Sequence, residues 1–150
     1  MASVDFVENA FRKLSASSVF PMRLKHEQKE AVDSLLQGRD VLAVMPTGYG
    51  KSFIFQLFST SIELKKIAEG KHANTVVLVI CPLTSLIQDQ VKEGKSLGLN
   101  CACLQDVKDS LSSCRRLDSP QLIFASAEQV LENDFQKILK DRSSNLHKAV

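Results

Sequence analysis

The sequence lacks the features that mark membrane-spanning and secreted proteins. Its longest uninterrupted apolar run, Val76 to Cys81, has six residues, whereas an apolar helix needs roughly 20 to cross a bilayer. Residues 1–9 carry acidic side chains and no apolar core segment, so we expect no secretory signal. The acceptor pattern for N-glycosylation, Asn-x-Ser/Thr, is also absent. These absences favour an intracellular protein.

Cysteine is scarce and irregularly placed. The four cysteines, Cys81, Cys101, Cys103 and Cys114, show neither the paired spacing of a zinc site nor a disulfide framework, and the three histidines are scattered. We therefore interpret the cysteines as free thiols that pack as small apolar residues. Because Cys101 and Cys103 are two positions apart, both face the same side if they lie on a strand.

Neither sign of charge dominates. The 150 residues include 19 Lys and Arg and 17 Asp and Glu, with a net charge of +2. A protein that binds nucleic acid through charge alone usually carries a basic stripe, so such binding here would require a shaped site. With 44% hydrophobic residues, a chain of this length can form an apolar core without disulfides or a structural metal.

Short apolar runs predict the strands. Residues 41–45, 76–81 and 122–125 are apolar throughout, and residues 101–104 form a weaker fourth run. Continuous apolar strands of this length are typical of parallel sheets that are buried on both faces. The sequence therefore predicts a parallel sheet.

Segments with helical spacing separate these runs, and Gly38 and Gly98 are suitable helix stops. The expected helices have apolar positions that include Val7 and Leu14, Val32 and Leu35, Ile54 and Leu57, Ile87 and Val91, Val107 and Leu111, and Val130 and Phe135. This alternation predicts an α/β fold, with an open, mostly parallel sheet and helices on both faces. Residues 148–150 look like the start of another strand, so we expect the chain to be part of a longer protein.

A glycine-rich segment, Met-Pro-Thr-Gly-Tyr-Gly-Lys-Ser at residues 45–52, joins the first expected strand to the third expected helix. Glycines let backbone N–H groups surround phosphate oxygens, and the helix N-terminus behind them favours anions. Lys51 would reach the β- and γ-phosphates, and the Ser52 hydroxyl would be a ligand of Mg²⁺. Met45 stands where the strict phosphate-loop pattern has glycine, and a plain strand-to-helix turn is the alternative interpretation.

Four segments together resemble the RecQ family of superfamily 2 DNA helicases. The phosphate-loop segment, continued as Phe-Ile-Phe-Gln-Leu at residues 53–57, is similar to the family's first motor motif, and residues 81–91 are similar to its Ser-Pro-Leu-x-Ser-Leu-x-x-Asp-Gln motif. Residues 24–28 resemble its Phe-Arg-Pro-Gly-Gln segment, and residues 124–128 resemble a motif that contacts nucleic acid. The resemblance implies the first RecA-like domain of a motor that unwinds DNA in the 3′ to 5′ direction with ATP.

The resemblance also implies a role for individual residues in binding ATP and Mg²⁺. Gln28 takes the place of the glutamine that reads adenine, and Lys25 takes the place of the family's arginine; from its residue type alone, Gln28 would be a solvated helix residue. Lys51 is the implied catalytic residue, and the Tyr49 side chain is expected to be exposed. The implied nucleotide-binding set is Lys25, Gln28, Thr47, Gly48, Tyr49, Gly50, Lys51 and Ser52.

The implied nucleic-acid contacts are Pro82, Ser85 and Ser126. They would lie near a DNA strand, mainly single-stranded or at a junction, and contact its phosphates without reading the sequence. Pro82 could instead be a simple strand stop, and Ser85 a helix cap or early helix residue.

The resemblance covers residues 21–150 as part of an ATP-binding domain, which residues 1–20 would precede as a helical extension. The family's acidic Asp-Glu-Ala-His motif and its second RecA-like domain would follow Val150. We therefore expect this chain alone to bind nucleotide without turnover, and we expect a nuclear location from the family. The alternative is a non-catalytic nucleotide-binding or interaction module.

Overall fold

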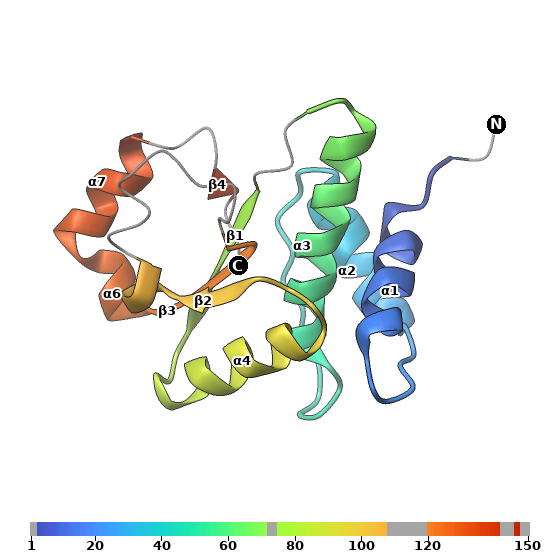
Figure 1. Cartoon of the computed structure of the whole chain (residues 1–150), viewed down its shortest axis with the longest axis horizontal. Helices are drawn as coiled ribbons and strands as arrows, with labels where there is room; N and C mark the ends of the chain where they lie inside the picture. Colours follow the sequence, from blue (N-terminus) through green and yellow to red (C-terminus); the bar gives the residue numbers. More distant parts are fainter. Residues whose placement is uncertain (1–2, 72–74, 108–119, 142–145, 148–150) are drawn as a thin grey trace. The chain divides into compact units, whose positions relative to one another are not determined.

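The computed structural model describes residues 3–71, 75–107, 120–141 and 146–147 (Figure 1). The chain divides into two compact units, Met1–Ala73 and Asn74–Val150, which are described here one at a time. None of the helices in the described ranges is long and apolar enough to cross a membrane.

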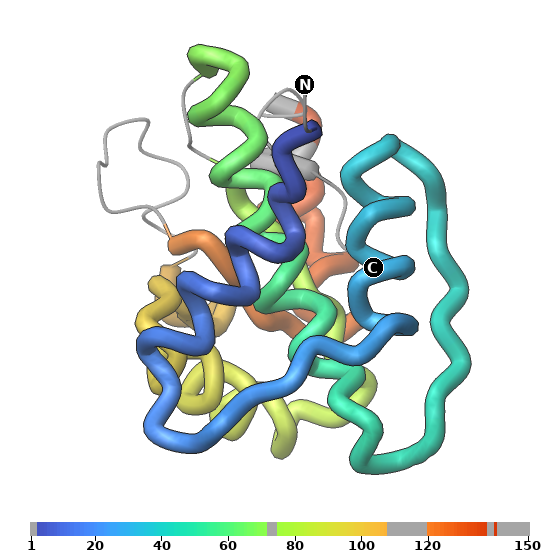
Figure 2. The backbone as a smooth tube through the Cα atoms, turned by 90° about the vertical axis from the view of Figure 1, so that its right-hand side faces the viewer, coloured from blue at the N-terminus to red at the C-terminus, as the bar shows by residue number. Residues whose placement is uncertain are grey.

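The described residues of the first unit form three helices, α1 (Phe6–Ser17), α2 (His26–Leu36) and α3 (Lys51–Ala68). They confirm the first three helices expected from apolar spacing. Helices α1 and α3 lie against each other (Figure 2), and the rings of Phe11 and Phe53 meet edge to face with centroids 6.2 Å apart. Such aromatic pairs add to the stability gained from apolar burial.

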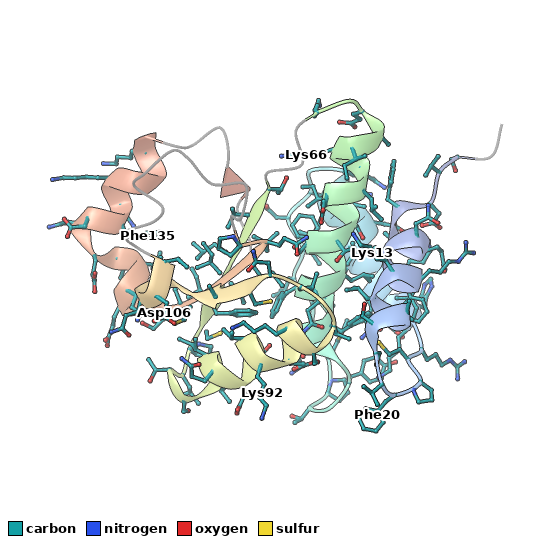
Figure 3. The ribbon with its side chains drawn as sticks, in the orientation of Figure 1. Lys13, Phe20, Lys66, Lys92, Asp106 and Phe135 are labelled. Carbon is teal, nitrogen blue, oxygen red and sulfur yellow. The ribbon has the colours of Figure 1, made fainter. Side chains whose placement is uncertain are left out.

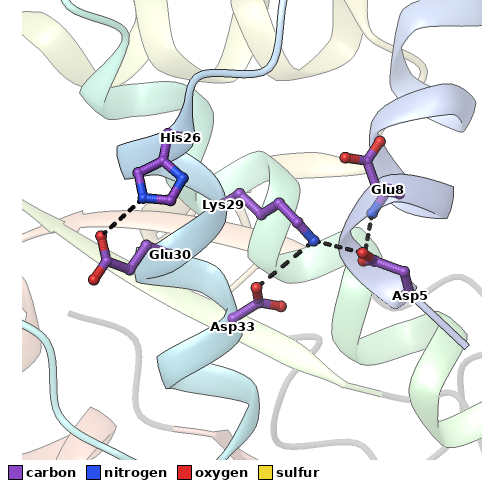
Figure 4. Close-up of polar contacts among 6 residues, drawn as sticks. All are labelled: Asp5, Glu8, His26, Lys29, Glu30 and Asp33. Atoms are coloured by element: carbon purple, nitrogen blue, oxygen red, sulfur yellow. Dashed lines mark hydrogen bonds and ion pairs between the residues drawn. The ribbon is translucent and has the colours of Figure 1, made fainter. Parts of the chain in front are cut away.

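An ion pair joins the start of α1 to α2 (Figure 4). The Lys29 ammonium lies 2.5 Å from the carboxylate of Asp5 and 3.7 Å from that of Asp33. Asp5 is also the N-cap of α1, and its carboxylate accepts a hydrogen bond from the backbone N–H of Glu8 at 3.0 Å. Partial burial raises the pKa of Asp5, but the bonds from Lys29 and Glu8 outweigh this effect and hold the pKa below its usual value. The bond to Asp5 raises the pKa of Lys29.

The prediction of a strand at residues 41–45 is wrong. These residues form an irregular connection between α2 and α3 (Figure 2), in which the side chains of Leu42 and Val44 are 92% and 87% exposed. A strand needs a neighbour for its backbone N–H and C=O groups, and residues 3–71 contain no other strand. Apolar composition alone therefore did not create a strand here.

In the second unit the described residues form a parallel sheet of four strands, β1 (Val76–Cys81), β2 (Cys101–Cys103), β3 (Leu122–Ser126) and β4 (Leu146–His147). Their order is β2-β3-β1-β4, and each of the three strand pairings is parallel. The expected open, mostly parallel sheet is confirmed. Strand β2 ends one residue earlier than the apolar run suggested, because Leu104 already begins a helical turn.

Helices cover both faces of this sheet. Helix α4 (Ser85–Ser96) packs on the face that holds Cys101, since a Cβ atom added to Gly94 would lie 2.3 Å from the Cys101 sulfur. The opposite face holds Leu78 and Ile123, which form one apolar cluster with residues of the helices that follow β3. Lys92 projects from α4 on the side away from the sheet (Figure 3).

The single helix expected around residues 130–139 is two helices, α6 (Ala127–Leu131) and α7 (Asn133–Asp141). Glu132 interrupts them with an extended backbone, at a ψ of 138°. In one continuous helix Val130 and Phe135 would point in directions about 140° apart, whereas the break lets both join the cluster under the sheet. For the helix expected around Val107, residues 104–107 are helical and the remainder lies outside the described ranges.

Candidate nucleotide-binding site

The glycine-rich segment forms a tight loop that leads directly into α3. Gly48 and Gly50 both have left-handed backbones, with φ of +79° and +89°, and Gly50 is the N-cap of α3. Within the loop, the N–H of Tyr49 donates a hydrogen bond to the carbonyl oxygen of Pro46 at 3.2 Å. Residues with a Cβ atom rarely adopt these φ values, so the two glycines let the chain reverse immediately before a helix N-terminus.

Gln28 connects α2 to this loop. Its side-chain nitrogen donates to the carbonyl oxygen of Gly50 at 2.9 Å, and its side-chain oxygen accepts from the backbone N–H of Lys25 at 3.0 Å. The second bond is half of a capping box, in which the residue at the third helical position bonds back to the cap. Gln28 is only 3% exposed, so the interpretation as a solvated helix residue is wrong.

Lys25 and Tyr49 form a second connection. The Lys25 ammonium donates to the carbonyl oxygen of Tyr49 at 2.7 Å and lies 3.9 Å from the centre of the Tyr49 ring. The Tyr49 hydroxyl donates to a carboxylate oxygen of Glu27 at 3.2 Å. The negative charge of Glu27, followed by this hydrogen bond, raises the pKa of Tyr49. The Tyr49 side chain, which was expected to be exposed, is half-buried and contacts two residues around the start of α2.

The remaining loop residues present polar groups to solvent. Thr47, Gly48 and Lys51 are exposed, and Ser52 is half-buried in the first turn of α3. A helix N-terminus has N–H groups without helical partners and a positive dipole end. Together with the Lys51 ammonium, this arrangement fits a chain of phosphates.

The oxygen atoms of the loop could bind Mg²⁺ only if the phosphates of a bound nucleotide supplied further ligands. Ser52 supplies one hydroxyl oxygen, and the described ranges contain no group of three or more His, Cys, Asp or Glu side chains that could hold a metal. Mg²⁺ in nucleotide sites is bound through few protein groups plus substrate phosphates and water.

Within the described ranges Cys81, Cys101 and Cys103 are free thiols.

In the second unit, Pro82 and Ser126 lie at the same edge of the sheet. Cys81 and Ser126 are register partners, so β1 and β3 end together, and Pro82 follows β1 directly. Ser126 is 7% exposed and caps α6, where its hydroxyl accepts from the N–H of Gln129 at 3.3 Å. Ser85 is the first residue of α4 and is exposed, which agrees with an early helix position.

A comparison with protein families finds the DEAD/DEAH box helicases, which match residues 25–148. The chain belongs to this helicase family. The match includes the glycine-rich loop, Gln28 and the parallel sheet. The expected kinship with RecQ helicases is confirmed as well, because curated relatives of that name are similar to the chain.

Three such relatives illustrate the range. This helicase chain is 33% identical over 132 residues to the ATP-dependent DNA helicase RecQ of Synechocystis. That alignment covers 88% of this chain and 23% of the relative. The chain is 39% identical over 82 residues to the RecQ-like DNA helicase blm-1 of Caenorhabditis elegans, covering 55% and 7%. It is 48% identical over 65 residues to the ATP-dependent helicase SGS1 of Saccharomyces cerevisiae, covering 43% and 4%. The chain thus spans less than a quarter of each relative's length.

Solved structures are similar to the chain as well, among them the crystal structure of a hypothetical ATP-dependent RNA helicase from Sulfolobus tokodaii. The alignment covers 98% of this chain and 57% of that chain, with 14% identity and a TM-score of 0.48.

The sequence predicted the loop of this helicase chain but not the contacts of Tyr49 with Glu27 and Lys25. Glycine spacing identified Gly48 and Gly50, and the family resemblance pointed to Gln28. No motif or periodicity indicated that Glu27 binds the Tyr49 hydroxyl, because the two residues are 22 positions apart. The signal available was that Glu27 lies between two residues already expected near the nucleotide.

Proposed function

We propose that this chain is the nucleotide-binding part of a RecQ-like motor that couples ATP hydrolysis to DNA unwinding in the 3′ to 5′ direction. The observation that carries the proposal is the hydrogen bond between Gln28 and Gly50. It joins the segment implied to read adenine to the loop implied to hold phosphate. Family membership and the RecQ relatives support the same conclusion.

Each residue of the loop would have a separate task in binding ATP. The exposed Lys51 would approach the β- and γ-phosphates, and the N–H groups around Gly48 and Gly50 would bind phosphate oxygens. Thr47 and Tyr49 would contribute through their backbone amides. The Ser52 hydroxyl would be a ligand of Mg²⁺, which supplies charge neutralisation for the phosphates when it is bound.

Recognition of adenine would use the hydrogen-bonding capacity that Gln28 has left. Each end of its amide has one partner in the protein, Gly50 for the nitrogen and Lys25 for the oxygen. The amide nitrogen carries two N–H groups and the oxygen two lone pairs. One donor and one acceptor site would therefore remain for the adenine edge while both protein bonds are kept.

The carboxyl ends of β1 and β3 would contact DNA. Pro82 and Ser85 are exposed at this edge, which is the edge where parallel sheets commonly bind ligands. Ser126 would act through its backbone, since its hydroxyl already caps α6. Contacts of this kind bind phosphates and would suit single-stranded or junction DNA of any sequence.

ATP turnover would need parts that lie outside these 150 residues. An acidic motif that completes Mg²⁺ coordination and a second RecA-like domain are expected in the full-length protein, with a nuclear location in a eukaryotic cell. The 150-residue chain would therefore bind ATP without hydrolysing it.

The test is nucleotide binding by the purified chain, measured with a fluorescent ATP analogue in the presence of Mg²⁺. Lys51→Ala should weaken binding about tenfold or more, since hydrogen bonds to charged groups contribute about 1.5–3 kcal/mol. Lys13→Ala is the matched control, because Lys13 is an exposed residue of α1. Equal affinity of the Lys51 variant and the wild type would contradict the proposal, and DNA-stimulated hydrolysis by the wild-type chain would contradict the lack of turnover.

A further inference from the structure

We propose that Lys25 and Tyr49 are positioning residues of the phosphate-binding loop. Lys25 acts on the loop's peptide groups, and so on the phosphate chain, instead of on the adenine base. The inference rests on the proposed function, because it concerns how the same loop binds nucleotide. Its basis is the contact that Lys25 makes with both the carbonyl oxygen and the ring of Tyr49.

Two successive carbonyl groups of the loop are held from the side of α2. The Tyr49 carbonyl accepts from the Lys25 ammonium at 2.7 Å, and the Gly50 carbonyl accepts from the Gln28 side chain at 2.9 Å. The peptide bonds in the described ranges are all trans, and in a planar trans peptide the C=O and the following N–H point in opposite directions. Fixing these carbonyls therefore turns the N–H groups of Gly50 and Lys51 away from Lys25 and Gln28.

Those two N–H groups are suited to bind an anion. In the described part of the chain, neither donates a backbone hydrogen bond within the loop, and both lie at the N-terminus of α3. A phosphate binds such a site most tightly when the donors are already oriented, because no conformational freedom is then lost on binding. Lys25 and Gln28 supply this orientation before the nucleotide arrives.

The Tyr49 side chain keeps Lys25 in place. Its ring lies 3.9 Å below the ammonium, within the range of a cation–π interaction. Its hydroxyl is bonded to Glu27, which fixes the ring on the side of α2. Any residue at position 49 would offer a carbonyl group, but only an aromatic side chain also offers a π face to Lys25.

The two possible roles of Lys25, orienting the loop and recognising the base, predict different effects of its loss on ligand binding. If Lys25 orients the loop, its loss weakens binding of every ligand that carries the phosphate chain. If Lys25 reads adenine, its loss weakens the binding of ATP alone. Inorganic tripolyphosphate, GTP and ATP are therefore the three probes, each titrated calorimetrically into the full chain with Mg²⁺.

We expect Lys25→Met to weaken binding of all three probes by the same factor, about tenfold. Lys25→Arg should restore most of the affinity, since a guanidinium can also donate to the carbonyl group and stack on the ring. Tyr49→Leu should weaken all three probes like the Lys25 variant, whereas Tyr49→Phe, which keeps the ring but loses the hydrogen bond to Glu27, should weaken them less. Thermal unfolding of each variant checks that the chain remains folded.

A spectroscopic measurement tests the arrangement without nucleotide. Tyr49 is the single tyrosine and the chain has no tryptophan, so the near-ultraviolet absorbance change on ionisation reports on this side chain alone. Because the charge of Glu27 and its hydrogen bond raise the pKa of Tyr49, Glu27→Gln should lower the pH at which the tyrosine ionises. An unchanged ionisation in Glu27→Gln would overturn the proposed anchoring of Tyr49.

The outcomes separate this inference from the proposed function. Wild-type chain that binds none of the three probes would overturn both. Wild-type binding with a loss confined to ATP in Lys25→Met would assign Lys25 to the base and overturn the inference alone. Wild-type binding with no loss in either Lys25→Met or Tyr49→Leu would also overturn the inference and leave the proposed function intact.

Discussion

The side-chain nitrogen of Gln28 lies 2.9 Å from the carbonyl oxygen of Gly50, and it would lie only 2.6 Å from a Cβ atom added to Gly50. The residue that connects α2 to the loop therefore also occupies the space that a side chain at position 50 would need. Glycine at position 50 therefore suits the backbone conformation, and any side chain there would displace the Gln28 amide.

Gly50→Ala and Gly48→Ala separate these two requirements. Both positions have positive φ, so each alanine costs about 1–2 kcal/mol of backbone strain. A Cβ atom at Gly48 meets nothing within 4 Å, whereas one at Gly50 meets Gln28. We expect Gly50→Ala to lower the free energy of unfolding by about 1 kcal/mol more than Gly48→Ala in urea titrations, because the Gln28 amide has to move and loses its bond to Gly50. Equal losses would mean that Gln28 moves aside without cost.

The ion pair between Asp5 and Lys29 predicts a pH dependence of stability. The pKa of Asp5 is lower in the folded chain than its ordinary value of 3.8, so its contribution is present above that pH and is lost as the pH falls through the folded value. Asp5 is substantially exposed, and we expect the contribution to stay below about 1 kcal/mol.

Asp5→Asn removes the charge and keeps a good N-cap residue. Its free energy of unfolding should lie below that of the wild type at pH 7, and the difference should shrink towards pH 2. Asp5→Ala also removes the cap and should cost about 1 kcal/mol more at both pH values. A difference between wild type and Asp5→Asn that is the same at pH 7 and pH 2 would contradict the assignment.

Gly94 and Cys101 should show strong energetic coupling. A Cβ atom at Gly94 would lie 2.3 Å from the Cys101 sulfur, so Gly94→Ala alone should destabilise the second unit by about 1–3 kcal/mol. Cys101→Ala removes the sulfur, and the double variant should therefore be more stable than the sum of the two single changes predicts. Urea unfolding of the four proteins gives the coupling energy, and additive effects would show that α4 does not lie this close to β2.

Leu42 provides a test of the connection between α2 and α3. Because its side chain is 92% exposed, Leu42→Ser should change the free energy of unfolding by less than about 0.5 kcal/mol. Leu57→Ser is the contrasting variant, since Leu57 is fully buried in α3, and it should cost several times more. A loss of about 2 kcal/mol or more in Leu42→Ser would show that residues 41–45 pack as a buried strand after all.

The sequence predicts β1 and β3 because both carry an unambiguous apolar pattern, whereas the pattern of β2 is weaker and β4 was not expected at Leu146–His147. The run Val76–Cys81 was expected at the bounds where β1 is found, and glycines mark the ends of α2 and α4 through positive φ at Gly38 and Gly98. Residues 41–45 have an equally apolar pattern but no strand. Apolar composition favours burial of a segment, whereas a strand forms only where the folded chain provides a neighbouring strand.

For the candidate site, too, the sequence predicted the local features but not the contacts between distant residues. Its glycines and Lys51 follow from local physics, because a phosphate loop is built from consecutive residues. The contact of Lys25 with Tyr49 joins residues 24 positions apart, and no periodicity connects them. The break at Glu132 was missed for a similar reason: Val130 and Phe135 both belong to one cluster, and helical spacing cannot show where a helix stops to allow that.

The pairing of β1 with β3 also means that β1 must wait, during synthesis of the chain, until β3 has been made. Strand β3 begins 41 positions after β1 ends, and at about 5–20 residues per second a ribosome needs roughly 2 to 8 s to make that stretch. For this interval the five residues Val77–Cys81 lack the β3 residues that they pair with, although they belong to the most continuously apolar segment of the chain. The nascent helicase chain therefore passes through a stage at which a chaperone that binds extended apolar segments has its best opportunity, and that stage closes when β3 emerges.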